Sequence, residues 1–181
     1  SATRWPDEQT VDDWSQGIPL SYIREVSDYW LNDYDHQRLA RRINKWDNFY
    51  TEINDVEIHF MHVQSTNAEA RPLLLSHGWP SSVVEFLKVI EPLTEPQNHG
   101  GNPSDSFHLI IPSLPGYGFS GRPKVTGWGV EKIADTWAEL MRRLGYRSYL
   151  AQGGDWGSAI TSALARQDVD HCLGIHLNLV F

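Results

Sequence analysis

The first part of the chain, up to about residue 47, spaces its apolar residues as an amphipathic helix does. In SYIREVSDYWLN (residues 21–32) these residues fall on one helical face: Tyr22, Ile23, Val26, Tyr29 and Trp30. Ser21 follows Pro19 and is the expected N-cap, because its hydroxyl oxygen can accept a hydrogen bond from a backbone N–H of the first helical turn. DHQRLARRIN (residues 35–44) predicts a second helix.

From residue 49 the period of the pattern changes to that of strands. VEIHFMHV (residues 56–63) places alternate apolar residues on one side of an extended segment. RPLLLSHG (residues 71–78) and FHLIIPS (residues 107–113) are short, solid apolar runs, which is typical of parallel strands buried on both faces. SYLAQ (residues 148–152) and CLGIHLNLVF (residues 172–181) predict two further strands.

Helical patterns alternate with these strands. SSVVEFLKVIEPL (residues 81–93) predicts one helix that ends before Pro92, and TEPQNHGGNPSDS (residues 94–106) predicts a loop. A stripe of apolar residues from Ile133 to Leu144 predicts a helix that stops at Gly145, and residues 156–166 predict another. The alternation predicts an α/β fold with a mostly parallel sheet, a helical extension over residues 1–48 and a core domain over residues 49–181.

Composition narrows the classes of partner. The chain has 181 residues, 40% of them hydrophobic, so a folded domain with a sizeable core is expected. A formal charge of −8 argues against nucleic acid or an anionic membrane as partner. No apolar run approaches the roughly 18–20 residues of a membrane span, and no signal peptide or anchor is expected. Cys172, the single cysteine, is expected in the core, and a cytoplasmic location is expected.

The segment GYGFSG (residues 116–121) matches the spacing G-x-G-x-x-G of dinucleotide-binding loops. That fingerprint requires the third glycine to open a helix whose N-terminus holds the pyrophosphate. Here Pro115 precedes the glycines and Pro123 follows them, so we expect an extended loop and no nucleotide site.

The stretch LAQGGDWGSAI (residues 150–160) predicts a sharp strand-to-helix turn that displays Asp155. Gly153 and Gly157 stand two residues before and two after Asp155, as in a nucleophile elbow. The alternative is that Asp155 only caps the helix that begins at Trp156, since aspartate is a favoured N-cap. A carboxylate nucleophile suits displacement at a saturated carbon, which indicates an epoxide or an alkyl halide as electrophile.

A second element, SHGWPSS (residues 76–82), follows a strand and precedes a predicted helix. In hydrolases built on such sheets, the loop after an earlier strand supplies one oxyanion-hole N–H, and the residue after the nucleophile supplies the other. The expected donors are the backbone N–H groups of Trp79 and Trp156, which leaves His77 as a scaffold residue.

Together, the motifs HGWP, PSLPGYGFS, LMRRLGY, QGGDWGS and GIHLN, preceded by EINDVEIHFMHV, resemble microsomal-type epoxide hydrolases of the α/β-hydrolase superfamily. The resemblance runs from about Tyr29 to Phe181. It implies an α/β-hydrolase fold and hydrolysis of epoxides to vicinal diols without a cofactor or a metal. It also implies that Asp155 is the nucleophile and that Trp79 and Trp156 form the oxyanion hole.

The family also needs a histidine base, an acidic partner and cap tyrosines, which follow the nucleophile in its members. Only 26 residues follow Asp155, and His171 and His176 among them are expected to be structural. We therefore expect the chain to be inactive alone and to require the remainder of the hydrolase, in the same or a separate chain. A homodimer, a haloalkane dehalogenase with the same aspartate and a non-catalytic binding module remain open alternatives.

Overall fold

The computed structural model describes residues 3–11 and 13–180. Its elements follow the chain in this order: α1 (Leu20–Asn32), α2 (Gln37–Ile43), β1 (Asn48–Ile53), β2 (Val56–Val63), β3 (Arg71–Ser76), η1 (Val83–Phe86), α3 (Ile90–Thr94), η2 (Pro96–His99), η3 (Pro103–Asp105), β4 (Phe107–Pro112), α4 (Val130–Arg143), β5 (Tyr149–Gly153), α5 (Trp156–Gln167) and β6 (Cys172–Leu177). The η elements are short 3₁₀-helices.

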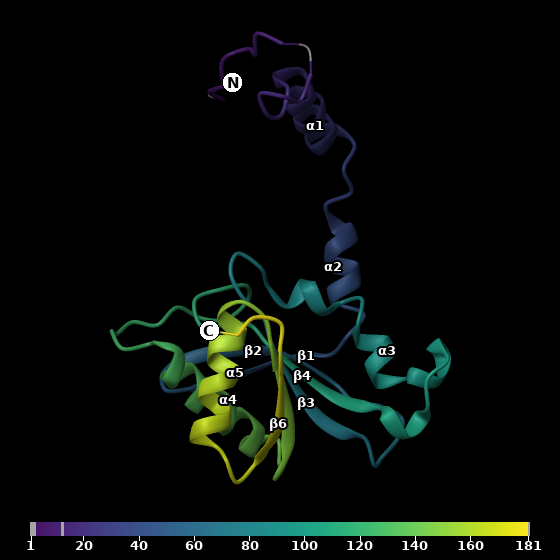
Figure 1. The fold of residues 1–181 in the computed structure, drawn as a ribbon, viewed down its shortest axis with the longest axis vertical. Coiled ribbons are helices and arrows are strands. Elements are labelled where there is room, and N and C mark those ends of the chain that lie inside the picture. The colour runs from purple at the N-terminus through teal and green to yellow at the C-terminus, as the bar shows by residue number, and fades with distance from the viewer. Residues whose placement is uncertain (1–2, 12, 181) are drawn as a thin grey trace. The chain divides into compact units, whose positions relative to one another are not determined.

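The chain divides into two compact units, Ser1–Arg41 and Arg42–Phe181. The first unit holds α1, and within it the Tyr22 ring meets Trp14 edge-on at 5.1 Å between centroids. The expected boundary at residue 48 between extension and core domain stays a prediction. The second unit holds the whole sheet and every candidate site residue (Figure 1).

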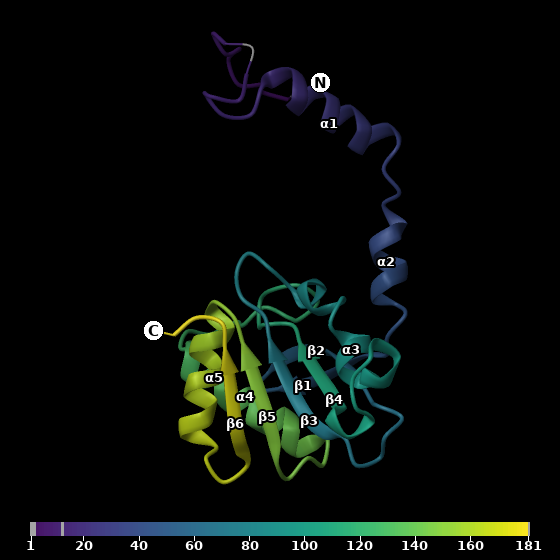
Figure 2. The same ribbon diagram turned by 45° about the vertical axis from the view of Figure 1, so that its right-hand side comes forward.

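The sheet has six strands in the order β1-β2-β4-β3-β5-β6. Strands β4, β3, β5 and β6 run parallel, and β1 and β2 add antiparallel pairings at one end. The predicted α/β class and mostly parallel sheet are confirmed. Figure 2 shows α4 and α5 on one face of this sheet and α3 on the other.

Alternate residues of the central strands enter two separate cores. Ile58, Leu74 and Ile110 pack beneath α4 and α5, whereas Met61 and Leu109 pack on the face of α3. Because both faces are covered, these strands read as solid apolar runs. Cys172 lies in the first core, as expected, and burial raises the pKa of its thiol.

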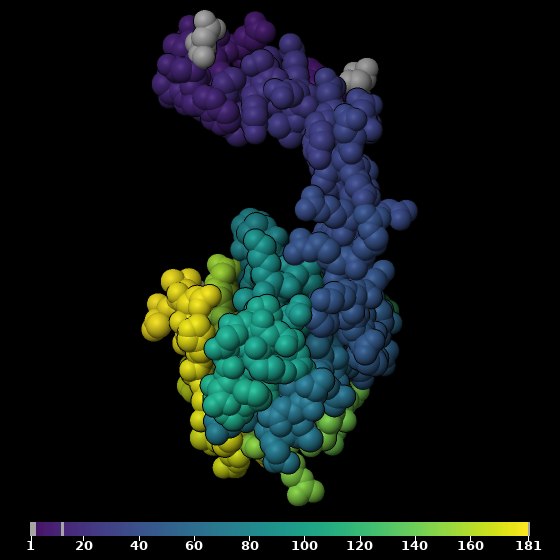
Figure 3. Space-filling view, turned by 90° about the vertical axis from the view of Figure 1, so that its right-hand side faces the viewer, coloured from purple at the N-terminus to yellow at the C-terminus, as the bar shows by residue number. Residues whose placement is uncertain are grey.

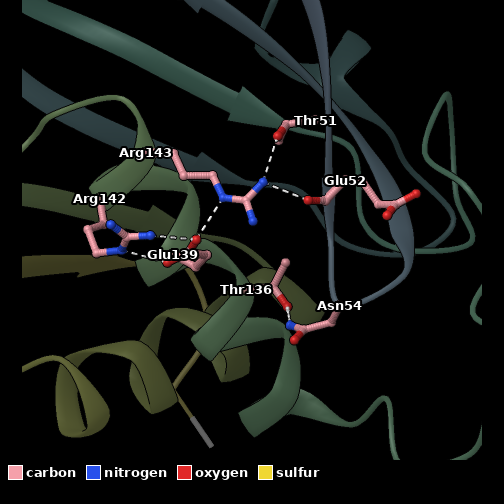
Figure 4. A network of polar contacts seen from close by, with 7 residues as sticks. All are labelled: Thr51, Glu52, Asn54, Thr136, Glu139, Arg142 and Arg143. Carbon is pink, nitrogen blue, oxygen red and sulfur yellow. Dashed lines mark hydrogen bonds and ion pairs between the residues drawn. The ribbon is translucent and has the colours of Figure 1, made fainter.

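Polar contacts tie α4 to the antiparallel end of the sheet (Figure 4). The Arg143 guanidinium donates to Thr51 Oγ1 at 2.9 Å and to the Glu52 carbonyl at 2.6 Å. Glu139 accepts from both Arg142 and Arg143, and these hydrogen bonds lower the pKa of its carboxyl to about 2. These hydrogen bonds therefore fix the position of α4 relative to β1.

Three local expectations are wrong. Residues 81–93 do not form one helix: η1 and the short α3 replace it, because β-branched residues at positions 83, 84, 89 and 90 weaken a continuous helix. Pro92 lies inside α3, in the first turn, where a backbone N–H would have no acceptor within the helix. Ser21 does not cap α1, because the helix already begins at Leu20 and Pro19 occupies the cap position.

One strand and two short 3₁₀-helices were not predicted from the sequence. Strand β1 had no predicted counterpart, because only Ile53 of its six residues is buried and no alternation marks it. The expected loop over residues 94–106 contains η2 and η3. The segment 116–121 forms turns without a helix, as predicted.

Strand β6 ends the sheet, and its apolar side chains Leu173 and Ile175 are exposed. A groove of about 840 Å³ runs over the α3 face, between the segment of Phe86 and Leu93 and the end of β6. In the space-filling view the teal α3 segment lies beside the yellow C-terminal residues (Figure 3). The part of the chain that the structure describes contains no helix long and apolar enough to cross a membrane.

Candidate active site

The turn between β5 and α5 displays Asp155. Gly153 ends β5, Trp156 begins α5, and Asp155 between them has φ 52° and ψ −128°. A non-glycine residue rarely adopts a positive φ, and such strain is found mainly at functional sites. The side chain is exposed. It makes no side-chain cap bond to α5, so the alternative of a simple helix cap lacks its defining contact.

The glycines around Asp155 are required by packing. A Cβ on Gly153 would lie 2.0 Å from the Gly157 carbonyl oxygen, and a Cβ on Gly157 would lie 2.0 Å from the Ser76 carbonyl oxygen. Both clashes are with backbone atoms, which cannot move aside. Gly154 differs, because its added Cβ would meet Asn178 Nδ2 at 3.5 Å, an ordinary contact. The two glycines at the elbow positions therefore let α5 start directly against β3.

The Trp79 N–H binds the Asp155 carboxylate, and the Trp156 N–H also lowers its pKa. The Trp79 N–H donates to Asp155 Oδ1 at 2.9 Å, from a residue 76 positions earlier in the chain. The pKa of the Asp155 carboxyl lies below its usual range, first because of the Trp156 N–H and then because of the Trp79 N–H. Asp155 is therefore ionised at neutral pH, and the structure brings all three predicted residues together.

The turn after β3 lies directly against this carboxylate. A Cβ on Gly78 would lie 2.5 Å from both Cβ and Oδ1 of Asp155, so this position also excludes a side chain. Gly78 was not predicted as a site residue, although its place in HGWP was a usable signal. Trp79 and Trp156 are 61% and 55% exposed, so both residues border open space.

A cavity of about 390 Å³ opens at this point. Its walls include Asp155 and Trp79, together with Glu85 from η1 and the segment Asn178–Leu179 that follows β6. These last three residues were not predicted, because they come from two separate segments that only the sheet brings together. A small organic molecule can therefore approach the carboxylate from one open side.

Neither downstream histidine serves Asp155 in the described residues. His171 precedes β6 at the opposite end of the sheet from Asp155, and its Nδ1 lies 2.6 Å from Asp168 Oδ1. His176 is exposed on β6, paired with Gln152, and the described structure shows no hydrogen bond from it to Asp155. Among residues 3–11 and 13–180, no group of three or more His, Cys, Asp or Glu side chains is placed to hold a metal ion.

Two sequence families match the chain. The family described as "Epoxide hydrolase N terminus" matches residues 1–86, and the family described as "alpha/beta hydrolase fold" matches residues 71–179. The second match contains all three candidate site residues. The expected resemblance to epoxide hydrolases is therefore confirmed at the level of the family.

Curated relatives agree with these matches. A bacterial protein of Stigmatella aurantiaca is 51% identical over 182 residues, covering 99% of this chain and 41% of its own length. Epoxide hydrolase 1 of Sus scrofa is 39% identical over 167 residues, covering 90% of this chain and 37% of its own length. The chain thus spans about two fifths of the length of these relatives.

Solved structures show the same fold. The Aspergillus niger epoxide hydrolase superposes with a TM-score of 0.84 at 32% identity, covering 99% of this chain and 47% of that one. The juvenile hormone epoxide hydrolase of Bombyx mori gives 0.83 at 35% identity, covering 97% and 47%. The chain therefore belongs to the α/β-hydrolase fold family and carries the N-terminal sequence of epoxide hydrolases ahead of that fold.

Proposed function

We propose that the protein containing this chain is an epoxide hydrolase that works through a covalent ester on Asp155. The observation that carries the proposal is the ionised Asp155 carboxylate, which is displayed at the β5–α5 turn and hydrogen-bonded by the Trp79 N–H, with the Trp156 N–H also lowering its pKa. The names of the relatives supply the substrate class, because several of them are called epoxide hydrolases.

The first chemical step forms the ester. An oxygen of the Asp155 carboxylate attacks one carbon of the epoxide, and the bond from that carbon to the ring oxygen breaks. The ring oxygen leaves as an alkoxide and takes a proton from an acid in the rest of the protein. Because the carboxylate is already ionised at neutral pH, this step needs no base.

The second step hydrolyses the ester at the Asp155 carbonyl carbon. Water, deprotonated by a base, adds to that carbon, and the carbonyl oxygen becomes an oxyanion that faces the two N–H donors. Collapse of this intermediate expels the diol oxygen, which is protonated, and restores the carboxylate with one oxygen from water. Loss of a single oxyanion-hole donor typically costs about 2.7–4 kcal/mol of transition-state stabilisation.

The base, its acidic partner and the acid that protonates the ring oxygen are placed, in this proposal, outside these 181 residues. The support is that the relatives are more than twice as long as the chain and that His171 lies at the wrong end of the sheet. The chain alone is accordingly expected to turn over no epoxide.

A haloalkane dehalogenase is the second candidate, and the exposed indole of Trp156 beside Asp155 favours it. An indole N–H could hold the departing halide, which needs no proton. The match of residues 1–86 to epoxide hydrolases favours the first candidate. The whole protein is expected to hydrolyse styrene-oxide-like epoxides and to release no halide from simple haloalkanes. Halide release with epoxides inert would reverse the choice.

The covalent scheme is tested by one turnover of the whole protein in ¹⁸O-labelled water. The label should enter Asp155, found by peptide mass spectrometry, while the first diol carries none. Asp155→Ala should form neither adduct nor diol and should keep its circular dichroism spectrum. Label that enters only the diol would mean direct attack by water and would overturn the scheme.

A further inference from the structure

His77 is a fully buried histidine that the two-step scheme does not use. Its ring makes two contacts with the backbone. The Leu114 N–H donates to Nε2 at 3.0 Å, and Nδ1 lies 2.9 Å from the Gly78 carbonyl oxygen. A backbone N–H can only donate, so Nε2 carries no proton. The ring is therefore the neutral tautomer whose Nδ1–H donates to Gly78.

The Gly78 carbonyl and the Trp79 N–H belong to one planar peptide unit. Its oxygen accepts from His77, and its N–H donates to Asp155 Oδ1 at 2.9 Å. A bond at the oxygen fixes the rotation of the plane and polarises the N–H on the other side, because chains of hydrogen bonds strengthen one another. His77 thus acts on the oxyanion donor without touching the nucleophile.

His77 is itself anchored through Leu114. The residue before it, Ser113, lies 2.9 Å through its Oγ from Nδ1 of the buried His59, whose Nε2 lies 2.9 Å from Asn48 Oδ1. A chain of hydrogen bonds and adjoining residues therefore leads from β1 to the peptide that faces Asp155. The Gly78 oxygen also accepts from the Ser81 N–H at 3.1 Å, so a change at His77 does not leave this carbonyl unpaired.

We propose that His77 is a positioning residue, whose Nδ1–H holds and polarises the Gly78–Trp79 peptide so that the Trp79 N–H stabilises the oxyanion formed on Asp155. The inference rests on the proposed function, because it assigns His77 to the hydrolysis of the ester. The second donor, the Trp156 N–H, has no hydrogen bond to the His77 ring in the described structure and provides an internal reference.

Two variants of the whole protein separate the two contacts of the ring. In His77→Asn the amide nitrogen lies near the Nδ1 position, so it can still donate to Gly78 but no longer reaches Leu114. In His77→Gln the amide oxygen lies near the Nε2 position, so it can still accept from Leu114 while the donor to Gly78 is lost. Both variants replace the imidazole ring with a smaller amide group, so each also removes part of the packing of the ring.

We expect His77→Gln to lower kcat about tenfold, the effect of one neutral hydrogen bond, and to lower KM with it. Both fall because ester hydrolysis slows while ester formation does not, so the adduct accumulates in intact-protein mass spectra. His77→Asn should lose less than about threefold in kcat by the same measure. Equal losses in both variants, in step with their melting temperatures, would reduce His77 to a structural role.

Nuclear magnetic resonance gives a readout that does not depend on turnover. In the wild type, ¹⁵N shifts should show His77 as the neutral Nδ1–H tautomer, and His77→Gln should move the Trp79 amide proton upfield while Trp156 stays in place. A proton on Nε2, or an unmoved Trp79 amide, would overturn the inference. If the wild type forms no adduct, the proposed function fails, and the amide shift still decides whether His77 controls the Trp79 N–H.

Discussion

Two turns meet at Asp155, and they obtain their shapes in different ways. The β5–α5 turn is shaped within a few residues, by the close approach of Gly153 to the Gly157 carbonyl and by the bonds of Ser158 to the carbonyls of Gly153 and Asp155. The turn after β3 is held by partners far along the chain, with Leu114 at a separation of 37 residues and Asp155 at 76.

The local turn displays the Asp155 side chain, whereas the second turn supplies an N–H donor that lowers the pKa of its carboxyl. A local turn can present Asp155 at the end of a strand, because the glycines and the start of α5 are consecutive in sequence. The second turn supplies a donor whose position depends on β4 and the loop after it. Damage to the first turn should therefore unfold the domain, whereas damage to the second should first disturb the carboxylate.

The largest effect is expected from breaking the local turn. Gly153→Ala places a methyl group 2.0 Å from the Gly157 carbonyl oxygen, so the start of α5 must move away from the end of β5. We expect a loss of more than about 4 kcal/mol in the free energy of unfolding, or no folded protein. Gly154→Ala is the matched control, and urea denaturation should place it within about 1 kcal/mol of wild type. Similar losses in both variants would contradict the packing argument.

A second effect concerns the long-range turn and depends on pH. Burial lowers the pKa of His59 to about 4, so below pH 6.5 the unfolded chain takes up a proton before the folded one does. The contribution of His59 to the free energy of unfolding is fully present above pH 6.5. It falls by about 3 kcal/mol as the pH decreases towards 4. Because His59 holds Ser113 beside Leu114, amide exchange after β3 should rise before exchange in α5.

The check is the melting temperature between pH 7 and pH 4 for wild type and His59→Gln. The variant starts lower but should follow a flatter curve, because glutamine does not titrate in this range. Burial also lowers the pKa values of His62 and His77, so the variant curve keeps part of the slope. Parallel curves for the two proteins would show that His59 does not carry this dependence.

The smallest effect tests the backbone strain at Asp155, the proposed nucleophile. With φ 52° and ψ −128°, position 155 suits glycine better than any residue with a side chain. Asp155→Gly should therefore melt a few degrees above Asp155→Ala, although both lack the carboxylate. Calorimetry of the two variants compares them directly, and equal melting temperatures would mean that the turn stores no strain.

The sequence by itself specified the local features of this protein. The strand over residues 56–63, the helix that stops near Gly145 and the elbow around Asp155 were all predicted, because their signals lie within a few consecutive residues. Where the pattern was weak, prediction stopped: β1 is mostly exposed and was missed. Residues 81–93 keep buried residues at helical spacing, yet the β-branched residues among them divide the segment into η1 and α3.

Only the tertiary structure decided how the candidate site is assembled. The sequence pattern predicted Asp155 as the nucleophile. The lowered pKa of its carboxyl, however, depends partly on an N–H group from 76 residues away. The tautomer of His77 follows from the Leu114 amide, and the cavity wall combines η1 with the segment after β6. Hydrogen bonds and cavities join residues that are distant in the chain, and no local pattern encodes the distance between them.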